Sequence, residues 1–195
     1  MQEMKKLREI KNELELALHR GSAVTGNSGV APNFSGFLNR LTTYATSSSG
    51  TTLTESVFND LISLTFATPV NLREAYANMF LKRTINRFTT NTQRFIASQE
   101  RRQVDIVEVI ESEVGILAIF KSRYQLQSAS KTTFGNSAIV IDPDFFQVGW
   151  LRPFETEVLG KDGDRERRML VGEATLIARS EKAGVAFKDY VANLV

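Results

Sequence analysis

Two acidic residues, Asp142 and Asp144, come closest in this sequence to a catalytic or metal-binding pair of carboxylates. Such pairs support glycoside hydrolysis or metal binding only when further ligands or acid–base partners surround them. Here they flank Pro143, directly after a short apolar segment. Turn formation and capping of the following segment explain this arrangement more simply, so we predict a structural role for both residues.

The other residues with chemical potential are few. The chain has a single histidine, His19, and no cysteine, which excludes disulfides, thiolate metal sites and cysteine nucleophiles. His19 ends a predicted helix, where positive charge suits the helix dipole, and we expect it on the surface. The Gly/Ser/Asn-rich stretch 21–36 matches no phosphate-binding motif. The sequence therefore predicts no catalytic residue, no metal site and no cofactor.

The overall composition is that of a globular chain. Of its 195 residues, 42% are hydrophobic and 24% are charged, which suits one good-sized domain or two smaller subdomains. The formal net charge of +2 predicts no strong attraction to nucleic acid. No apolar run reaches about 18 residues, so no membrane-spanning helix is expected. The charged N-terminal segment also lacks the apolar core of a signal peptide.

Three helices are predicted from hydrophobic spacing and capping residues. Residues 3–20 have apolar side chains at every third or fourth position, which indicates an amphipathic helix that ends at Gly21. A second helix is expected over 53–66 and a third over 72–84, the third with Asn71 as its cap.

The start and the buried face of the second helix can be specified further. Thr52 and Glu55 form a candidate capping box, and Thr54 is the alternative cap. The expected buried face consists of three residues flanked by two others: Val57, Leu61 and Leu64, with Phe58 and Ile62 beside them.

From about Arg94 the pattern becomes extended. Segments 104–110 and 114–120 are rich in β-branched residues, and we interpret them as a β-hairpin with a short acidic tip at 111–113. The hairpin would carry opposite charges at its two ends, formed by Glu111 and Glu113 at the tip and by Arg101 and Arg102 at the other end.

The C-terminal part also favours strands. We expect strands at 138–141 and 169–178, with a tight turn at 161–164 centred on Asp-Gly. The apolar segment 183–194 is compatible with a strand or a helix. Together these elements predict an α+β fold.

The segment 139–176 carries a more specific pattern. An apolar strand, Asp-Pro and aromatic residues are followed by Leu151-Arg152-Pro153-Phe154, then by the turn Lys161 to Arg168, then by Glu173-Ala174-Thr175-Leu176. This ordered set, with the charged helix, the Gly/Asn loop, the Leu-Thr-Glu helix start and the hairpin before it, resembles tailed-bacteriophage major capsid proteins of the Hong Kong 97 fold. The resemblance covers nearly the whole chain.

The resemblance implies a peripheral domain built on a long spine helix and an axial domain of helices around a small sheet. The spine helix would lie in residues 1–30, and in this family an N-terminal arm and an extended loop precede it, so the expected subunit lacks both. The remaining segments would alternate between domains: 31–100 axial, 101–130 a peripheral β-hairpin, 131–165 axial, and 166–195 a peripheral C-terminal strand.

The resemblance also implies a function without catalysis. Subunits of this kind self-assemble into hexamers and pentamers of an icosahedral shell that encloses double-stranded DNA. The expected location is the virion, after assembly in the cytoplasm of the host bacterium. The expected partners are copies of the same chain, a decoration, scaffold or portal protein, and weakly, non-specifically bound DNA, with no membrane.

Particular residues follow as hypotheses from this role. Trp150 and Phe154 are expected to anchor the axial core. Nine charged residues are expected to contact neighbouring subunits: Lys161, Asp164, Arg165, Arg167, Arg168, Glu111, Glu113, Arg101 and Arg102.

Two alternatives remain. The first is an encapsulin-like nanocompartment shell, which shares the fold and differs in its cargo. The second is a soluble enzyme or binding module that uses Asp142 and Asp144, or Arg165, Arg167 and Arg168, as its site.

Overall fold

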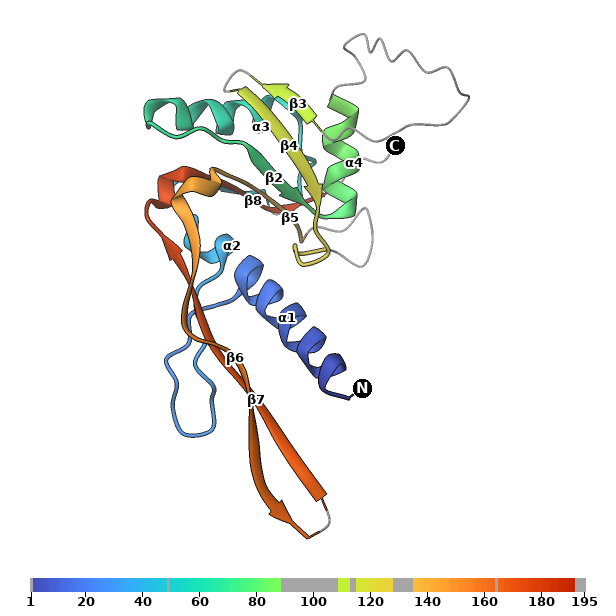
Figure 1. The fold of residues 1–195 in the computed structure, drawn as a ribbon. Coiled ribbons are helices and arrows are strands. Elements are labelled where there is room, and N and C mark those ends of the chain that lie inside the picture. The colour runs from blue at the N-terminus through green and yellow to red at the C-terminus, as the bar shows by residue number, and fades with distance from the viewer. Residues whose placement is uncertain are drawn as a thin grey trace, which may run out of the picture.

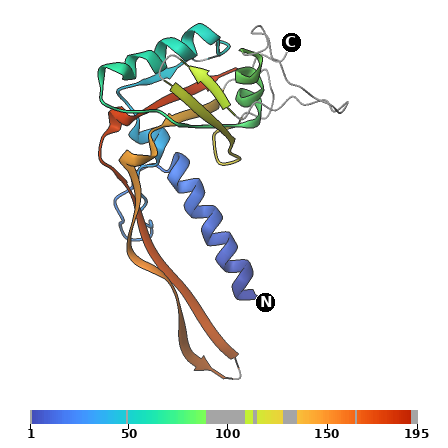
Figure 2. The ribbon, with the colours of Figure 1, turned by 45° about the horizontal axis from the view of Figure 1, so that its top comes forward.

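The computed structural model describes residues 2–48, 50–88, 109–112, 115–127, 135–163 and 165–191. These residues form two parts (Figure 1). The first, called here the sheet lobe, is a six-stranded sheet with its covering helices. The second, called the arm, is the two-stranded hairpin of β6 (Phe146–Asp162) and β7 (Arg165–Ala178). Helix α1 (Gln2–Arg20) leaves the lobe on the same side as the arm (Figure 2).

The sheet lobe is a mixed sheet, which confirms the expected α+β class. Its strand order is β1-β8-β5-β2-β4-β3, with β1/β8 and β2/β4 parallel and the other pairs antiparallel. The strands are β1 (Ala45–Ser47), β2 (Glu74–Ala77), β3 (Val109–Ser112), β4 (Gly115–Lys121), β5 (Asn136–Ile141) and β8 (Gly184–Tyr190). Every residue of β5 is buried, as expected of a central strand that is covered on both faces.

Two apolar clusters hold the lobe together. On one face, α3 (Glu55–Ser63), the 3₁₀ helix η1 (Leu64–Ala67) and α4 (Met79–Phe88) cover the sheet, and this larger cluster includes the fully buried Phe187 of β8. On the other face, α2 (Phe37–Arg40) and the residue after it, Leu41, pack against β5 and β8.

Helix α3 was predicted correctly in place and only partly in detail. Its cap is Thr54, whose side chain accepts a hydrogen bond from the Val57 amide, so the alternative cap was the correct one. Phe58 and Ile62 are buried, whereas Val57 and Leu64 are 36% and 54% exposed. The face with Phe58 and Ile62 points inward because the Phe58 ring stacks on Phe187, with 5.3 Å between ring centroids.

The helix predicted over 72–84 is wrong in its first half. Residues 74–77 form β2, and the helix α4 begins only at Met79, after Asn78, whose side chain accepts a hydrogen bond from the Leu81 amide. Strand β2 is paired with β4 on one side and β5 on the other, and Ala75 and Ala77 are buried. Pairing on both sides overrides the local helix propensity.

The predicted β-hairpin is present where the structure describes it, as antiparallel β3 and β4; residues 104–108 lie outside the described residues. The hairpin was expected in the peripheral domain and the strand at 138–141 in the axial domain. This division is wrong, because β4 and β5 both pair with β2 in one sheet. Leu117 and Ile119 are buried in the same cluster as Val140 of β5, and this shared core places the hairpin in the sheet lobe.

The arm has the predicted tight turn. Strand β6 ends at Asp162, β7 begins at Arg165, and Gly163 between them has φ +71°, a conformation that favours glycine. After β7 the chain passes through η4 (Glu181–Ala183) into β8, so the ambiguous C-terminal segment is a strand as far as Tyr190.

Two glycines let the C-terminal end of α1 pack closely on the next segment. The Gly21 amide donates to the Ala17 carbonyl, and the Gly36 amide donates to the Gly21 carbonyl. Both hydrogen bonds have a donor–acceptor distance of 2.8 Å. A Cβ atom added at Gly36 would lie 2.7 Å from both the Leu18 oxygen and the Gly21 nitrogen. Because these are backbone atoms, the contact has no flexible side chain that could move away.

We therefore expect Gly36→Ala to lower the free energy of unfolding by about 1–3 kcal/mol, the usual cost of overpacking. Gly160→Ala is the matched control, because a Cβ atom there meets nothing within 4 Å, and it should change stability by less than about 0.5 kcal/mol. Urea denaturation of the three proteins measures both values. Equal stability of the two variants would contradict the packing argument.

Candidate functional site

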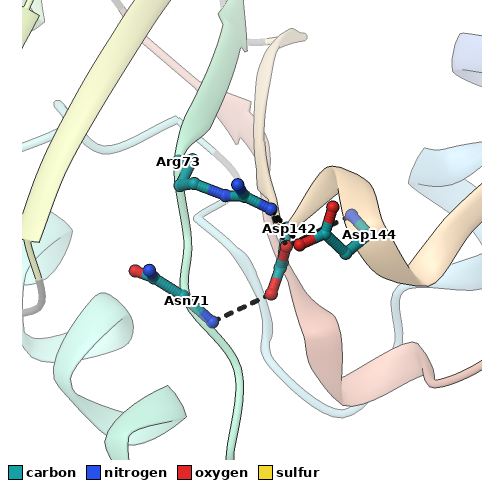
Figure 3. A network of polar contacts seen from close by, with 4 residues as sticks. All are labelled: Asn71, Arg73, Asp142 and Asp144. Carbon is teal, nitrogen blue, oxygen red and sulfur yellow. Dashed lines mark hydrogen bonds and ion pairs between the residues drawn. The ribbon is translucent and has the colours of Figure 1, made fainter.

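Asp142 and Asp144 lie where β5 leaves the sheet lobe for the arm (Figure 3). The Asp142 carboxylate is 2% exposed and accepts hydrogen bonds from the Asn71 amide at 2.9 Å and the Asp144 amide at 3.2 Å. The Arg73 guanidinium donates to Asp142 at 3.2 Å and also pairs with Asp144. The predicted capping role of Asp142 is confirmed.

This network is arranged to hold two segments together. The oxygens of Asp142 are bonded to groups of the protein itself, from β5 to the segment before β2. Among the described residues, no group of three or more His, Asp or Glu side chains could hold a metal ion. The pair therefore fixes the start of the arm.

A second carboxylate fixes the point where the chain returns from the arm. Glu181, in η4, accepts hydrogen bonds from the Thr42 hydroxyl at 2.9 Å, the Thr43 amide at 3.1 Å and the Thr43 hydroxyl. These bonds, first of all the one from the Thr43 hydroxyl, lower the pKa of Glu181. Both ends of the arm are thus tied to the sheet lobe by polar contacts of a carboxylate.

Removal of the buried carboxylate should be far more costly than removal of its exposed neighbour. We expect Asp142→Ala to lower the free energy of unfolding by about 2–4 kcal/mol, because it leaves buried backbone donors without a partner. Asp144→Ala should cost less than about 1 kcal/mol, since the Asp144 side chain is 74% exposed.

Urea denaturation followed by circular dichroism measures both effects. A loss of stability of similar size in the two variants would show that Asp142 is not the main contact between the start of the arm and the segment before β2.

The arm carries large apolar side chains that the chain itself leaves open. Trp150 is 47% exposed, Leu151 80% and Val158 72%. Leu159, Met169 and Ile177 are exposed as well. A two-stranded ribbon on its own is marginal in water, because it has no second layer to cover it. The arm therefore has the properties of a surface that another molecule covers.

The expectation that Trp150 and Phe154 anchor the axial core is wrong. Both lie in β6, where their rings pack edge to face with 5.1 Å between centroids. Phe154 rests over Gly172 of β7, which leaves space for its ring. The aromatic pair covers the ribbon locally because the ribbon has no core to enter.

The predicted charged residues are only partly brought together. Lys161, Arg165, Arg167 and Arg168 lie at the far end of the arm, in and beside its turn. Glu111 lies in β3 of the sheet lobe, so it is not part of that group. Asp164, Glu113, Arg101 and Arg102 lie outside the described residues.

One of these charges already has a partner in the same chain. The Arg168 guanidinium donates to the Glu3 carboxylate of α1 at 2.5 Å, across 165 positions of sequence. Nearer the lobe, Arg152 and Glu173 pair across the two strands at 3.7 Å. The basic end of the arm is therefore tied to the N-terminal end of α1.

The expectation that His19 lies on the surface is wrong. The side chain is only 7% exposed, and its two ring nitrogens contact Ser122 and Gln125 of the segment after β4. Burial lowers the pKa of His19 to about 4, so the ring is neutral at pH 7. No local pattern predicts this, because its partners are more than 100 positions away.

The candidate site is thus an exposed arm that polar contacts attach to the sheet lobe. Residues 1–191 match the family of the SU10 major capsid protein. The chain belongs to this family. Its members are structural subunits of phage capsids, and the capsid is the location that the family implies for this chain. No curated protein matches the sequence.

The similar solved structures include an encapsulin and a phage structure. One is the holo-SrpI encapsulin complex from Synechococcus elongatus PCC 7942, with 10% sequence identity and a TM-score of 0.63. The alignment covers 98% of this chain and 65% of the encapsulin chain. The other is a structure from Mycobacterium phage Ogopogo, with 15% sequence identity and a TM-score of 0.44. The alignment covers 89% of this chain and 62% of the phage chain.

This capsid subunit therefore spans just under two thirds of the length of each similar chain. The first likeness confirms the expected Hong Kong 97-type fold, which encapsulin shells share. In the part of the chain that the structure describes, no helix is long and apolar enough to cross a membrane.

The sole tryptophan reports directly on whether the arm is covered. If Trp150 becomes buried when subunits assemble, its fluorescence emission should shift to shorter wavelength and acrylamide quenching should fall. Dissociated and assembled protein at equal concentration provide the comparison. Identical emission and quenching in the two states would mean that this part of the arm stays open in the assembly.

Proposed function

We propose that this major capsid subunit assembles with copies of itself into the hexamers and pentamers of an icosahedral shell that encloses double-stranded DNA. The observation that carries the proposal is the arm, a long hairpin whose apolar side chains the subunit does not cover. Shell subunits need extended surfaces of this kind, because each copy must contact several neighbours in a repeated way.

The contacts themselves combine apolar area with charge. Fully burying a side chain such as Leu151 or Val158 contributes about 1.5–3 kcal/mol, and both are largely exposed in the subunit. Exposed ion pairs contribute less, about 0–1 kcal/mol each, but they select the partner and its orientation. The apolar part of the arm would supply affinity, and the charged end would fix register.

The charged end of the arm is the proposed contact with a neighbouring subunit. Its described members are Lys161, Arg165, Arg167 and Arg168, and Asp164 is proposed as a further contact. Glu111, Glu113, Arg101 and Arg102 remain proposed contacts elsewhere on the subunit. The net charge of +2 suits a shell wall that touches packaged DNA weakly and without sequence preference.

The further partners are proposed on the same basis. A decoration, scaffold or portal protein would bind the assembled shell, and assembly would take place in the cytoplasm of the host bacterium. An encapsulin-like compartment is the second candidate, favoured by the likeness in fold to an encapsulin shell. The contents of purified particles separate the two, since a phage shell holds DNA and an encapsulin-like compartment holds protein cargo.

The arm-end contact is tested by replacing three charges at once. We expect Arg165→Gln, Arg167→Gln and Arg168→Gln together to raise the protein concentration needed for assembly by about tenfold, because a loss of about 0.5 kcal/mol at each position amounts to about 1.5 kcal/mol. Light scattering and negative-stain microscopy measure assembly. Circular dichroism should show an unchanged fold.

The matched control replaces the same three arginines by lysine, which keeps the charge and should retain most of the assembly. Assembly of the glutamine variant at the wild-type concentration would refute a role for these charges.

A further inference from the structure

Helix α1 contacts the arm at its N-terminal end and the sheet lobe at its C-terminal end. At its N-terminal end Glu3 binds Arg168 near the far end of the arm. At its C-terminal end His19 is inserted into the sheet lobe, where both ends of the arm are also fixed. A helix of 19 residues is about 28 Å long. The helix therefore runs from the lobe along the same side as the arm, which extends beyond it (Figures 1 and 2), and the contact of Glu3 with Arg168 joins its N-terminal end to the arm.

The surroundings of His19 define one protonation state. The Gln125 side-chain amide lies 3.0 Å from Nδ1 and can only donate to it, because the Gln125 oxygen already accepts from the Ser137 hydroxyl at 2.8 Å. Nδ1 is therefore an acceptor, and the proton is on Nε2, which donates to the Ser122 hydroxyl oxygen at 3.3 Å. The site is matched to a neutral imidazole of a single tautomer.

Aromatic rings complete this socket. Tyr124 stacks on the imidazole at 6.0 Å between centroids, and Tyr76 of β2 packs against its edge at 5.7 Å. The Tyr124 hydroxyl also donates to Asn12 on α1 at 2.9 Å, about two turns before His19. The helix is thus held at two points along its C-terminal half, which fixes its direction.

We propose that α1 is a strut that sets the angle of the arm on the sheet lobe, and that His19, as a neutral ring, is the positioning residue at its fixed end. The angle matters only if the arm contacts neighbouring subunits, so its use in assembly rests on the proposed function. The strut itself is a property of the single subunit and can be tested without assembly.

A second proton on the His19 ring would release the C-terminal end of α1 from the sheet lobe. Nδ1–H would then face the Gln125 amide, donor against donor, and rotating that amide would break its bond with Ser137. The titratable groups whose rings contact His19 are Tyr76 and Tyr124. Tyr76 in turn donates to Glu74 and lies in the field of Glu15 on α1. Burial raises the pKa of Tyr76, so it stays neutral in acid.

The direction of the pH effect follows from linkage. A released imidazole titrates near 6.5, and the docked one has a pKa of about 4, so protons bind the released state more tightly. Docking is unaffected above pH 6.5 and weakens as the pH falls from there towards 4. At pH 5 the ratio of docked to released α1 should be about thirtyfold lower than at neutral pH.

The angle of the arm can be measured by pulsed electron–electron resonance between two spin labels. The chain contains no cysteine, so Glu55→Cys on α3 and Glu157→Cys on β6, both exposed, give one defined distance. On unassembled subunits at pH 7.5 we expect a narrow distance distribution. At pH 5 it should broaden, and in a His19→Gln background it should be the same at both pH values.

The other end of the strut is tested by exchanging charges. Glu3→Arg or Arg168→Glu alone should broaden the distribution at pH 7.5, and the two together should restore it, because the ion pair is rebuilt in reverse. The single histidine also allows nuclear magnetic resonance to read its tautomer and its titration directly, without any variant.

The proposal fails if the wild-type distribution is already broad at pH 7.5, if acid broadens the wild type and His19→Gln equally, or if His19 titrates near 6.5. It also fails if the charge exchange does not restore the distribution. A pH-dependent angle with unaltered shell assembly would preserve the strut and contradict the proposed use of the arm.

Discussion

The constraint on which this structure depends is that a two-stranded ribbon cannot bury its own side chains. The arm extends far beyond the sheet lobe, and residues such as Leu151 and Val158 remain in contact with solvent. Local devices, such as the packing of Trp150 on Phe154 and the Arg152–Glu173 pair, cover only part of it. Everything that gives the arm a defined direction must therefore come from the lobe and from α1.

The lobe supplies that direction through polar contacts at its border. Its stability comes from a core of buried apolar residues around Phe187 and β5. The arm is attached at this border by the polar contacts of Asp142 and Glu181 and by the packing of Phe146 on Phe37. Helix α1 is attached to the lobe by the socket of His19. Directional hydrogen bonds between satisfied polar groups allow one arrangement, whereas apolar packing alone tolerates several.

The family and the fold rest on different observations. Membership of the SU10 major capsid protein family rests on a match across residues 1–191. The likeness to an encapsulin, at 10% identity, rests on backbone arrangement alone. A common fold at such low identity is expected when the pattern of strands and helices is retained while individual contacts change.

Several features followed from sequence because they depend on residues close together in the chain. The periodicity of 3–20 gave α1, Asp-Gly gave the turn of the arm, and Asp142 before Pro143 gave a cap. The ordered motifs of 139–176 led to the correct family because turn and strand residues must keep their spacing.

Other features were decided only in three dimensions. Residues 74–77 became a strand because β4 and β5 pair with them from distant parts of the chain. His19 became buried because Ser122 and Gln125 lie beside it, and Trp150 stayed exposed because no layer covers the ribbon. Local sequence thus determined where elements start, turn and end. Only tertiary structure decided which faces are covered, because the groups that cover them are remote in sequence.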